Sequence, residues 1–343
     1  MKLMIQRLVC CLAFLAAAGS SPAAHAQTTT LRYSNWFPVG QAIRVDVIEP
    51  WLAEIEKVTQ GRVKIETMPK VVGSLPAQFD VARDGQPDLV VFVPGYTPNR
   101  FDIIEGAQLP FMSDNPEVYG PAVDRFYRKH VASFNEFKGV HPLSVFTVSP
   151  GQLFNSKRAM KSLADFKGLK IRSPQASATQ ALSLLGGVPV AKPVSETYEL
   201  LSSGVLDGTF MPPESIPVWK LTELISYATI IPGAIYNTIL VMAINEDKWK
   251  SLRAEDREAI TRISGDTFAR DVGRVYAKGD AAAFDQMRKA GKSVEILPDQ
   301  VVAEMKRVLQ PIERDWAAKV AKKGVKSPDQ LIQSLRDELA ASR

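Results

Sequence analysis

The stretch that decides the fold is GQPDLVVFVPGY, residues 85–96. Gly85 and Pro87 mark a turn, and an unbroken apolar run from Leu89 to Val93 follows before Pro94. Such a run indicates a central strand that is buried on both faces, as in parallel sheets covered by helices. It therefore predicts an α/β fold.

Segments with helical and strand periodicity alternate around this run, which is typical of α/β layers. We expect further strands at residues 31–35, 63–66, 143–146, 169–172, 188–190, 206–211 and 238–244, the last returning to the first sheet. We expect helices at 42–59, 178–185, 195–203, 254–290, 300–323 and 328–341. The proline-free stretch 254–290 predicts one long helix or two nearly collinear helices. Pro311 predicts a kink or a break in the helix that contains it.

The first 26 residues differ from the rest of the chain. Lys2 and Arg7 precede an apolar segment at residues 8–18, and Ala24-His25-Ala26 supplies the small-x-small pattern of a signal peptidase site. A membrane anchor is the alternative, but the apolar segment is far shorter than the roughly 20 residues that cross a bilayer. We therefore predict a cleaved export signal at residues 1–26 and a mature protein free in the periplasm.

Composition excludes several classes of function. Both cysteines, Cys10 and Cys11, lie within the predicted signal, so the mature chain would have no disulfide, thiolate metal site or cysteine nucleophile. The net charge of +5 is spread over the sequence without a basic run, which argues against nucleic-acid binding. The hydrophobic fraction of 45% and the charged fraction of 23% are those of an ordinary globular protein, which we expect to be a monomer.

No catalytic constellation is apparent in the sequence. The mature chain would retain only His130 and His141, and neither has the spacing of a metal ligand. There is no G-x-S-x-G, no H-E-x-x-H and no phosphate-binding glycine loop. We therefore predict a protein that is not an enzyme and that needs no cofactor.

The predicted strand ends carry aromatic, apolar and polar residues and one cation. In an open α/β sheet, ligands bind outside the carboxyl ends of the strands. The side chains expected there are Trp36, Phe37, Tyr96, Gln152, Arg172, Phe210 and Met211. Each aromatic residue taken alone is more often packed in a core or a lid. Together they predict an apolar cleft with one fixed cation.

The segment around Arg172 favours a rigid position for that cation. Ser162 and Asp165 have the spacing of a capping box, and Gly168 permits a left-handed stop before the short strand. Pro174 forces the chain away just after Arg172. A solvated surface charge is the alternative, but a guanidinium on a rigid element suits bidentate recognition of a carboxylate.

Three segments in order resemble the solute-binding proteins of tripartite ATP-independent periplasmic (TRAP) transporters, of the DctP type. They are SKRAMKSLADFKGLKIRSP (156–174), PVSETYELLSSGVLDG (193–208) and LVMAINEDKWKSL (240–252). The resemblance implies a two-lobed periplasmic-binding-protein fold with a long helix spanning both lobes. It assigns 27–147 and 238–290 to lobe I, 148–237 to lobe II, and 291–343 to C-terminal helices packing on the lobes. It also implies a small organic acid paired with Arg172, the arginine of K-I-R-x-P, and handed to membrane permease subunits.

Two departures from the family pattern bear on the ligand. Sialic-acid-binding members carry a second arginine where this chain has Gln152, and members that bind keto acids through a metal carry Glu-Trp where it has Phe210 and Met211. We therefore expect no metal and a monocarboxylate with an apolar or aromatic body, with Asn237 and Gln152 orienting a hydroxyl or keto oxygen. Alternatives are a ligand-binding sensor subunit and a secreted enzyme acting on organic acids.

Overall fold

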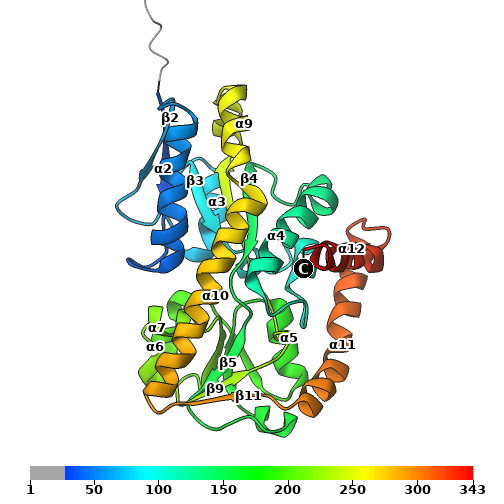
Figure 1. Cartoon of the computed structure of the whole chain (residues 1–343). Helices are drawn as coiled ribbons and strands as arrows, with labels where there is room; N and C mark the ends of the chain where they lie inside the picture. Colours follow the sequence, from blue (N-terminus) through cyan, green and yellow to red (C-terminus); the bar gives the residue numbers. More distant parts are fainter. Residues whose placement is uncertain (1–27, 343) are drawn as a thin grey trace, which may run out of the picture.

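The computed structural model describes residues 28–342, and the export signal predicted at residues 1–26 lies outside this range. The described chain forms two β-sheets, one above the other in Figure 1, with helices packed around both. The predicted α/β class and two-lobed architecture are confirmed. We call the first sheet with its helices lobe I and the second sheet with its helices lobe II.

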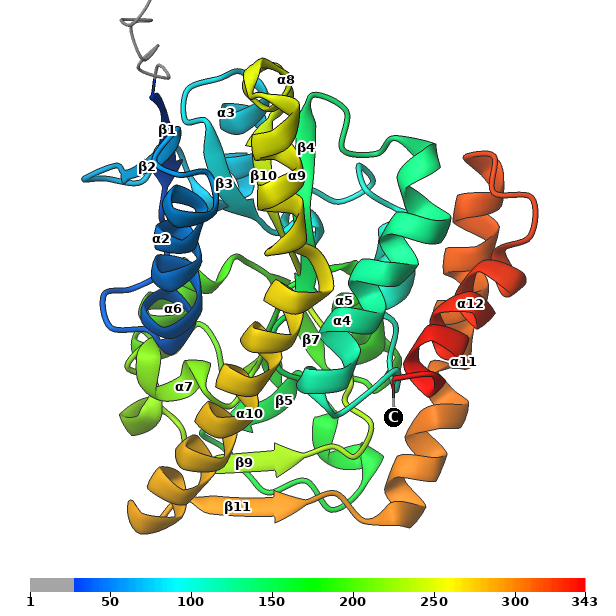
Figure 2. The same ribbon diagram turned by 45° about the horizontal axis from the view of Figure 1, so that its top comes forward.

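Lobe I contains a five-stranded sheet of order β2-β1-β3-β10-β4 (Figure 2). Its strands are β1 (Thr29–Ser34), β2 (Val63–Thr67), β3 (Leu89–Phe92), β4 (Val140–Thr147) and β10 (Ile239–Asn245). Strand β3, predicted to be central, is buried along its whole length and pairs in parallel with β1 and antiparallel with β10. The predicted return of β10 to this sheet is confirmed.

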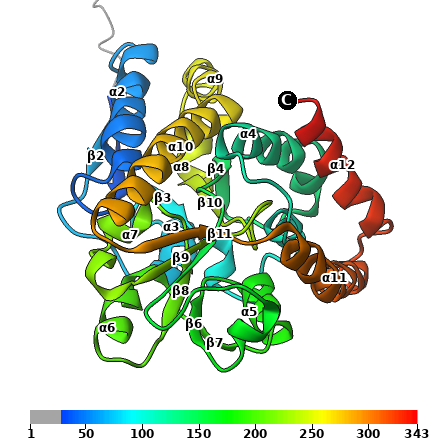
Figure 3. The same cartoon turned by 60° about the horizontal axis from the view of Figure 1, so that its bottom comes forward.

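Lobe II contains a six-stranded sheet of order β11-β9-β5-β8-β6-β7 (Figure 3). Its strands are β5 (Gln152–Asn155), β6 (Lys170–Ser173), β7 (Val188–Ala191), β8 (Gly208–Met211), β9 (Tyr227–Ile230) and β11 (Ser293–Ile296). The sequence pattern missed β5, β9 and β11. In β5 the apolar residues Leu153 and Phe154 are adjacent rather than alternating with polar residues, so its sequence has no strand period.

The described helices pack on both sheets. They are α2 (Glu49–Val58), α3 (Gln78–Arg83), α4 (Pro116–Phe126), α5 (Ala176–Leu184), α6 (Thr197–Ser202), α7 (Ser215–Val218), α8 (Glu246–Ser251), α9 (Ala254–Arg262), α10 (Gly265–Lys289), α11 (Asp299–Lys322) and α12 (Pro328–Ala340). A π-helical turn, η1 (Ile43–Ile48), precedes α2 within the helix predicted at 42–59. Pro50 has no N–H to donate to Asp46, and the wider turn accommodates this gap.

The long stretch at 254–290 forms two helices that are separated by Ile263 and Ser264. Gly265, the first residue of α10, has φ +64°, a left-handed conformation that turns the chain between the two helices. Helix α10 packs on α4 and β4 of lobe I and reaches β11 of lobe II, as Figure 2 shows. The predicted helix spanning both lobes is therefore α10.

Two further segments cross between the lobes, one from β4 to β5 and one from β9 to β10. They are hydrogen bonded to each other, because Gly151 N–H donates to the Tyr236 carbonyl (2.9 Å) and Val148 N–H to the Thr238 carbonyl (3.2 Å). This paired crossing places residues of both segments between the two sheets.

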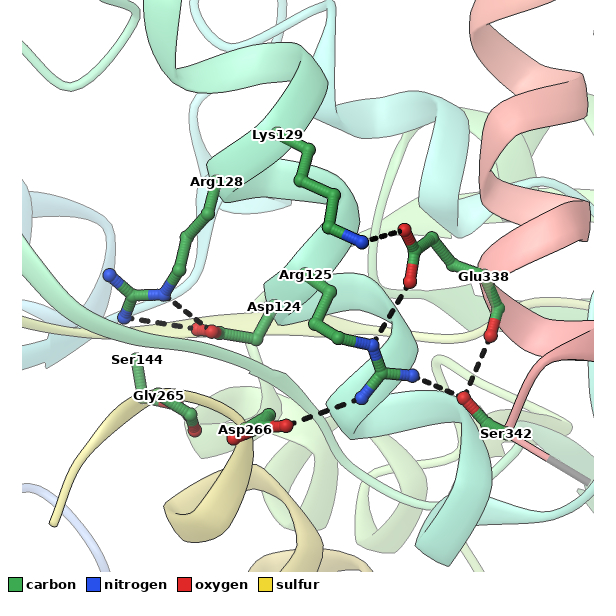
Figure 4. Close-up of polar contacts among 9 residues, drawn as sticks. All are labelled: Asp124, Arg125, Arg128, Lys129, Ser144, Gly265, Asp266, Glu338 and Ser342. Carbon is green, nitrogen blue, oxygen red and sulfur yellow. Dashed lines mark hydrogen bonds and ion pairs between the residues drawn. The ribbon is translucent and has the colours of Figure 1, made fainter. Parts of the chain in front are cut away.

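The C-terminal helices pack at the edge of the molecule opposite α10. Helix α11 continues through Pro311 and contacts α5 of lobe II, and its Trp316 indole donates to the Asp102 carbonyl (2.9 Å) of lobe I. Helix α12 is held on α4 and the turn after it by Glu338, which accepts from Lys129 (2.6 Å) and Arg125 (3.0 Å), as Figure 4 shows. These contacts attach α11 and α12 to the edge of the molecule. The residues between the two sheets come from other elements.

Candidate binding cavity between the lobes

A small cavity lies between the two lobes. About 50 Å³ of it is open to the centre of a water molecule, several times the roughly 10–15 Å³ that one water requires. Its lining residues come from strand ends, the crossing segments and α10: Trp36, Phe37, Gln41, Val93, Tyr96, Val148, Arg172, Pro174, Val194, Met211, Pro212, Ser215, Trp219, Tyr236, Thr238, Leu240 and Tyr276. Five of the eight residues predicted for the site are among them.

Arg172 is the single cation among the described residues that line the cavity. The capping box forms as predicted, since Asp165 accepts from the Ser162 N–H (2.8 Å) and hydroxyl (3.0 Å), and Gly168 has φ +76°. Strand β6 follows, and Arg172 near its end is only 2% exposed. The alternative of a solvated surface charge is therefore wrong.

The guanidinium of Arg172 is oriented by three hydrogen bonds to the protein. Nε donates to the Lys192 carbonyl (2.8 Å), Nη1 to the Phe210 carbonyl (3.1 Å) and Nη2 to the Tyr96 hydroxyl (3.4 Å). Arginine carries five N–H groups, so one remains on each terminal nitrogen. Among the described residues, no acidic side chain lines the cavity. Arg172 is therefore a buried cation in a fixed orientation, with two N–H groups still able to donate to a ligand.

Aromatic rings form much of the remaining wall. Trp36 stacks on Phe37 with ring centroids 4.0 Å apart, and its indole N–H donates to the Val91 carbonyl (2.7 Å). Tyr96 also belongs to lobe I, and its hydroxyl oxygen accepts the Val194 N–H of lobe II (3.1 Å). These contacts hold the rings in place, so the wall is pre-formed.

Three predicted site residues lie outside this lining. Gln152 is 5% exposed, and its side-chain oxygen accepts the N–H of Ile231 (2.6 Å), the residue that follows β9. The Phe210 ring is in the core, and only its carbonyl reaches the site, through Arg172. Asn237 donates to the Ser113 carbonyl (3.2 Å). A ligand-binding role for these three side chains remains a prediction.

Sequence reasoning missed several lining residues, among them Gln41, Ser215, Trp219, Tyr236 and Tyr276. Tyr276 has the helical spacing of the core residues of α10, so its pattern gives no sign of a cavity. Tyr236 could have been found, because it precedes a predicted site residue in the crossing segment. Burial raises the pKa of the Tyr236 hydroxyl, and the charge of Arg172 offsets this only in part, so the hydroxyl stays protonated.

Two carboxyl groups lie beside the cavity wall. Glu214, next to the lining residue Ser215, is 5% exposed, and its backbone N–H donates to Asp280 of α10 (3.0 Å). Burial raises the pKa of Glu214 to about 7, although hydrogen bonds from Ser215 and Gln41 lower it in part.

This carboxyl group makes the stability of the protein depend on pH. Because its pKa is higher in the folded than in the unfolded chain, its contribution to stability is full below about pH 4.5 and is lost as the pH rises through about 7. Glu214→Gln is therefore expected to raise Tm relative to wild type more at pH 8 than at pH 5. Differential scanning fluorimetry measures this, with the exposed Glu258→Gln as control. An equal gain at both pH values would contradict the assignment.

Residues 28–342 contain neither a candidate metal site nor a candidate membrane span. No group of three His, Cys, Asp or Glu side chains there is arranged to hold a metal ion. No helix in that range is long and apolar enough to cross a membrane.

Comparison with known proteins places the chain in a family. Two lobes with a cavity between them and a helix spanning both define a class of solute-binding protein. The chain belongs to the bacterial extracellular solute-binding proteins of family 7, whose sequence profile matches residues 37–319. It is a TRAP solute-binding protein of the DctP type, and proteins of this family are periplasmic.

Solved structures of relatives support this assignment. A TRAP periplasmic solute-binding protein from Bordetella bronchiseptica, with bound (R)- and (S)-mandelate, is 33% identical with a TM-score of 0.87, covering 92% of this chain and 100% of that one. A TRAP solute-binding protein from Rhodoferax ferrireducens, with copurified benzoate, is 29% identical with a TM-score of 0.86, covering 92% and 98%. An outer membrane transporter protein, TsaT, from Comamonas testosteroni is 27% identical over 98% of this chain and 99% of its own.

Proposed function

We propose that this protein captures a small aromatic monocarboxylic acid in the periplasm and delivers it to TRAP permease subunits in the membrane. The observation that carries the proposal is the guanidinium of Arg172, 2% exposed, hydrogen bonded on three sides and left with two N–H donors. A carboxylate that accepts both donors forms a bidentate, charge-assisted pair. It also compensates a buried charge that would otherwise be costly.

The rest of the cavity favours an aromatic body for the ligand. Trp36, Phe37 and Tyr96 provide ring faces and edges, and Met211 adds a polarisable apolar contact. No second cation lines the described cavity, so a second carboxylate would be buried without a partner. The relatives crystallised with mandelate and benzoate hold acids of this kind.

A calorimetric comparison of ligands tests the proposal. Benzoate and (R)-mandelate are expected to bind, whereas succinate and glucuronate should bind at least about 100-fold more weakly, because a second carboxylate or a polar ring costs several kcal/mol in this lining. Tighter binding of succinate than of benzoate would contradict the assignment. Prolonged incubation followed by mass spectrometry should return the acid unchanged, whereas turnover would favour the enzyme alternative.

Delivery to the permease requires a separate experiment. Cells that express TRAP permease subunits should accumulate labelled benzoate only when this protein is present. Ligand binding without such accumulation would favour the alternative of a sensor subunit.

A further inference from the structure

Gln41 contributes a side-chain oxygen to the cavity wall that has no hydrogen-bond partner among the described residues. The residue is 3% exposed and lines the cavity from lobe I, just before η1. Its backbone is already satisfied, since its N–H donates to the Pro38 carbonyl (3.2 Å) and its carbonyl accepts from Arg44 (2.9 Å). The side-chain oxygen, however, makes no hydrogen bond to any described residue.

A buried amide oxygen without a partner is costly. Most buried polar atoms in proteins are hydrogen bonded, and leaving one unpaired costs about 1–3 kcal/mol. The position of Gln41 on the cavity wall means that a bound ligand can supply the missing partner. The ligand group must then be able to donate a hydrogen bond.

The surroundings of Gln41 disfavour an anionic group and favour a neutral donor. The carboxyl group of Glu214 accepts the hydroxyl of Ser215 (3.2 Å), and Asp280 accepts the Glu214 N–H (3.0 Å). Two acidic groups therefore lie next to this part of the wall, and a second carboxylate on the ligand would be repelled. The Gln41 NH₂ group already donates to Glu214, so the free group is the side-chain oxygen, to which a ligand hydroxyl can donate.

We infer that Gln41 is a specificity-determining residue that recognises a hydroxyl substituent on the aromatic acid whose carboxylate pairs with Arg172. The inference rests on the proposed function and narrows its ligand to hydroxylated aromatic monocarboxylates. Gln41 belongs to lobe I and Arg172 to lobe II. A ligand that bonds to both residues therefore joins the two lobes, and its hydroxyl adds to the stability of the closed form.

Matched pairs of acids test this assignment by calorimetry. The pairs are benzoate with 3-hydroxybenzoate, benzoate with 4-hydroxybenzoate, and phenylacetate with mandelate. We expect wild type to bind at least one hydroxylated acid about 10-fold more tightly than its parent, as a satisfied buried hydrogen bond provides. Gln41→Met keeps the approximate volume but removes the amide, so the ratio of affinities for the hydroxylated and the parent acid should fall to about one.

The possible outcomes separate the two proposals. If wild type binds each pair equally, or if Gln41→Met weakens both members of a pair alike, the role of Gln41 is overturned and the proposed function stands. If wild type binds none of these acids, both proposals fail. Circular dichroism and Tm of Gln41→Met establish that the variant is folded, and Gln41→Asn, which keeps an amide on a shorter side chain, should retain part of the preference.

Discussion

Replacing Arg172 by lysine is expected to weaken the binding of benzoate by about 100-fold, because a lost hydrogen bond to a charged group costs about 1.5–3 kcal/mol. Lysine keeps the positive charge but loses the planar fork. It cannot bond to the carbonyls of Lys192 and Phe210 and still present two parallel donors to a carboxylate. Isothermal titration calorimetry of the purified variant measures the loss.

Arg158 offers a matched control in the same lobe. Its guanidinium also donates to two backbone carbonyls, those of Asp165 (2.9 Å) and Lys167 (2.8 Å), but it does not line the cavity. Arg158→Lys should therefore leave the affinity for benzoate within about twofold of wild type, since it removes only exposed contacts. Unchanged affinity in Arg172→Lys, or an equal loss in both variants, would contradict the carboxylate-binding role of Arg172.

Several features of the fold follow directly from local sequence signals. The apolar run at 89–93 predicted the buried strand β3, and the Ser162, Asp165 and Gly168 pattern predicted the turn before β6. These signals are strong because each depends on residues close together in the chain. The position of Arg172 at a strand end was predicted for the same reason.

The parts of the site that the sequence did not predict depend on contacts between residues far apart in the chain. Gln152 was expected in the cavity because it follows the strand predicted at 143–146, yet its side chain bonds to the Ile231 backbone of the crossing segment. Gln41 carries no local signal at all, since its place depends on how lobe I meets Glu214 and α10. The periodicity of a single segment cannot predict which residues of the two lobes come into contact. These residues are brought together only in the folded structure.

The second large effect is expected at Gly151, where the chain crosses between the lobes. A Cβ atom at this position would lie 1.9 Å from Cε1 and 2.1 Å from Cζ of Tyr236, whose ring lines the cavity and is fully buried. Gly151→Ala must therefore displace the ring or separate the two crossing segments. Overpacking of this kind typically costs about 1–3 kcal/mol, so we expect Tm to fall by about 5 °C and benzoate affinity to fall at least about 10-fold.

Gly106→Ala provides the same kind of clash away from the cavity. Its added Cβ would lie 2.5 Å from the ring of Trp316, where α11 packs on lobe I. Both variants should lose thermal stability, but only Gly151→Ala should lose ligand affinity when the two are compared at a temperature where both remain folded. If Gly106→Ala weakens benzoate binding as much as Gly151→Ala, then general loss of stability explains the effect. The Tyr236 ring would in that case have no specific part in shaping the cavity.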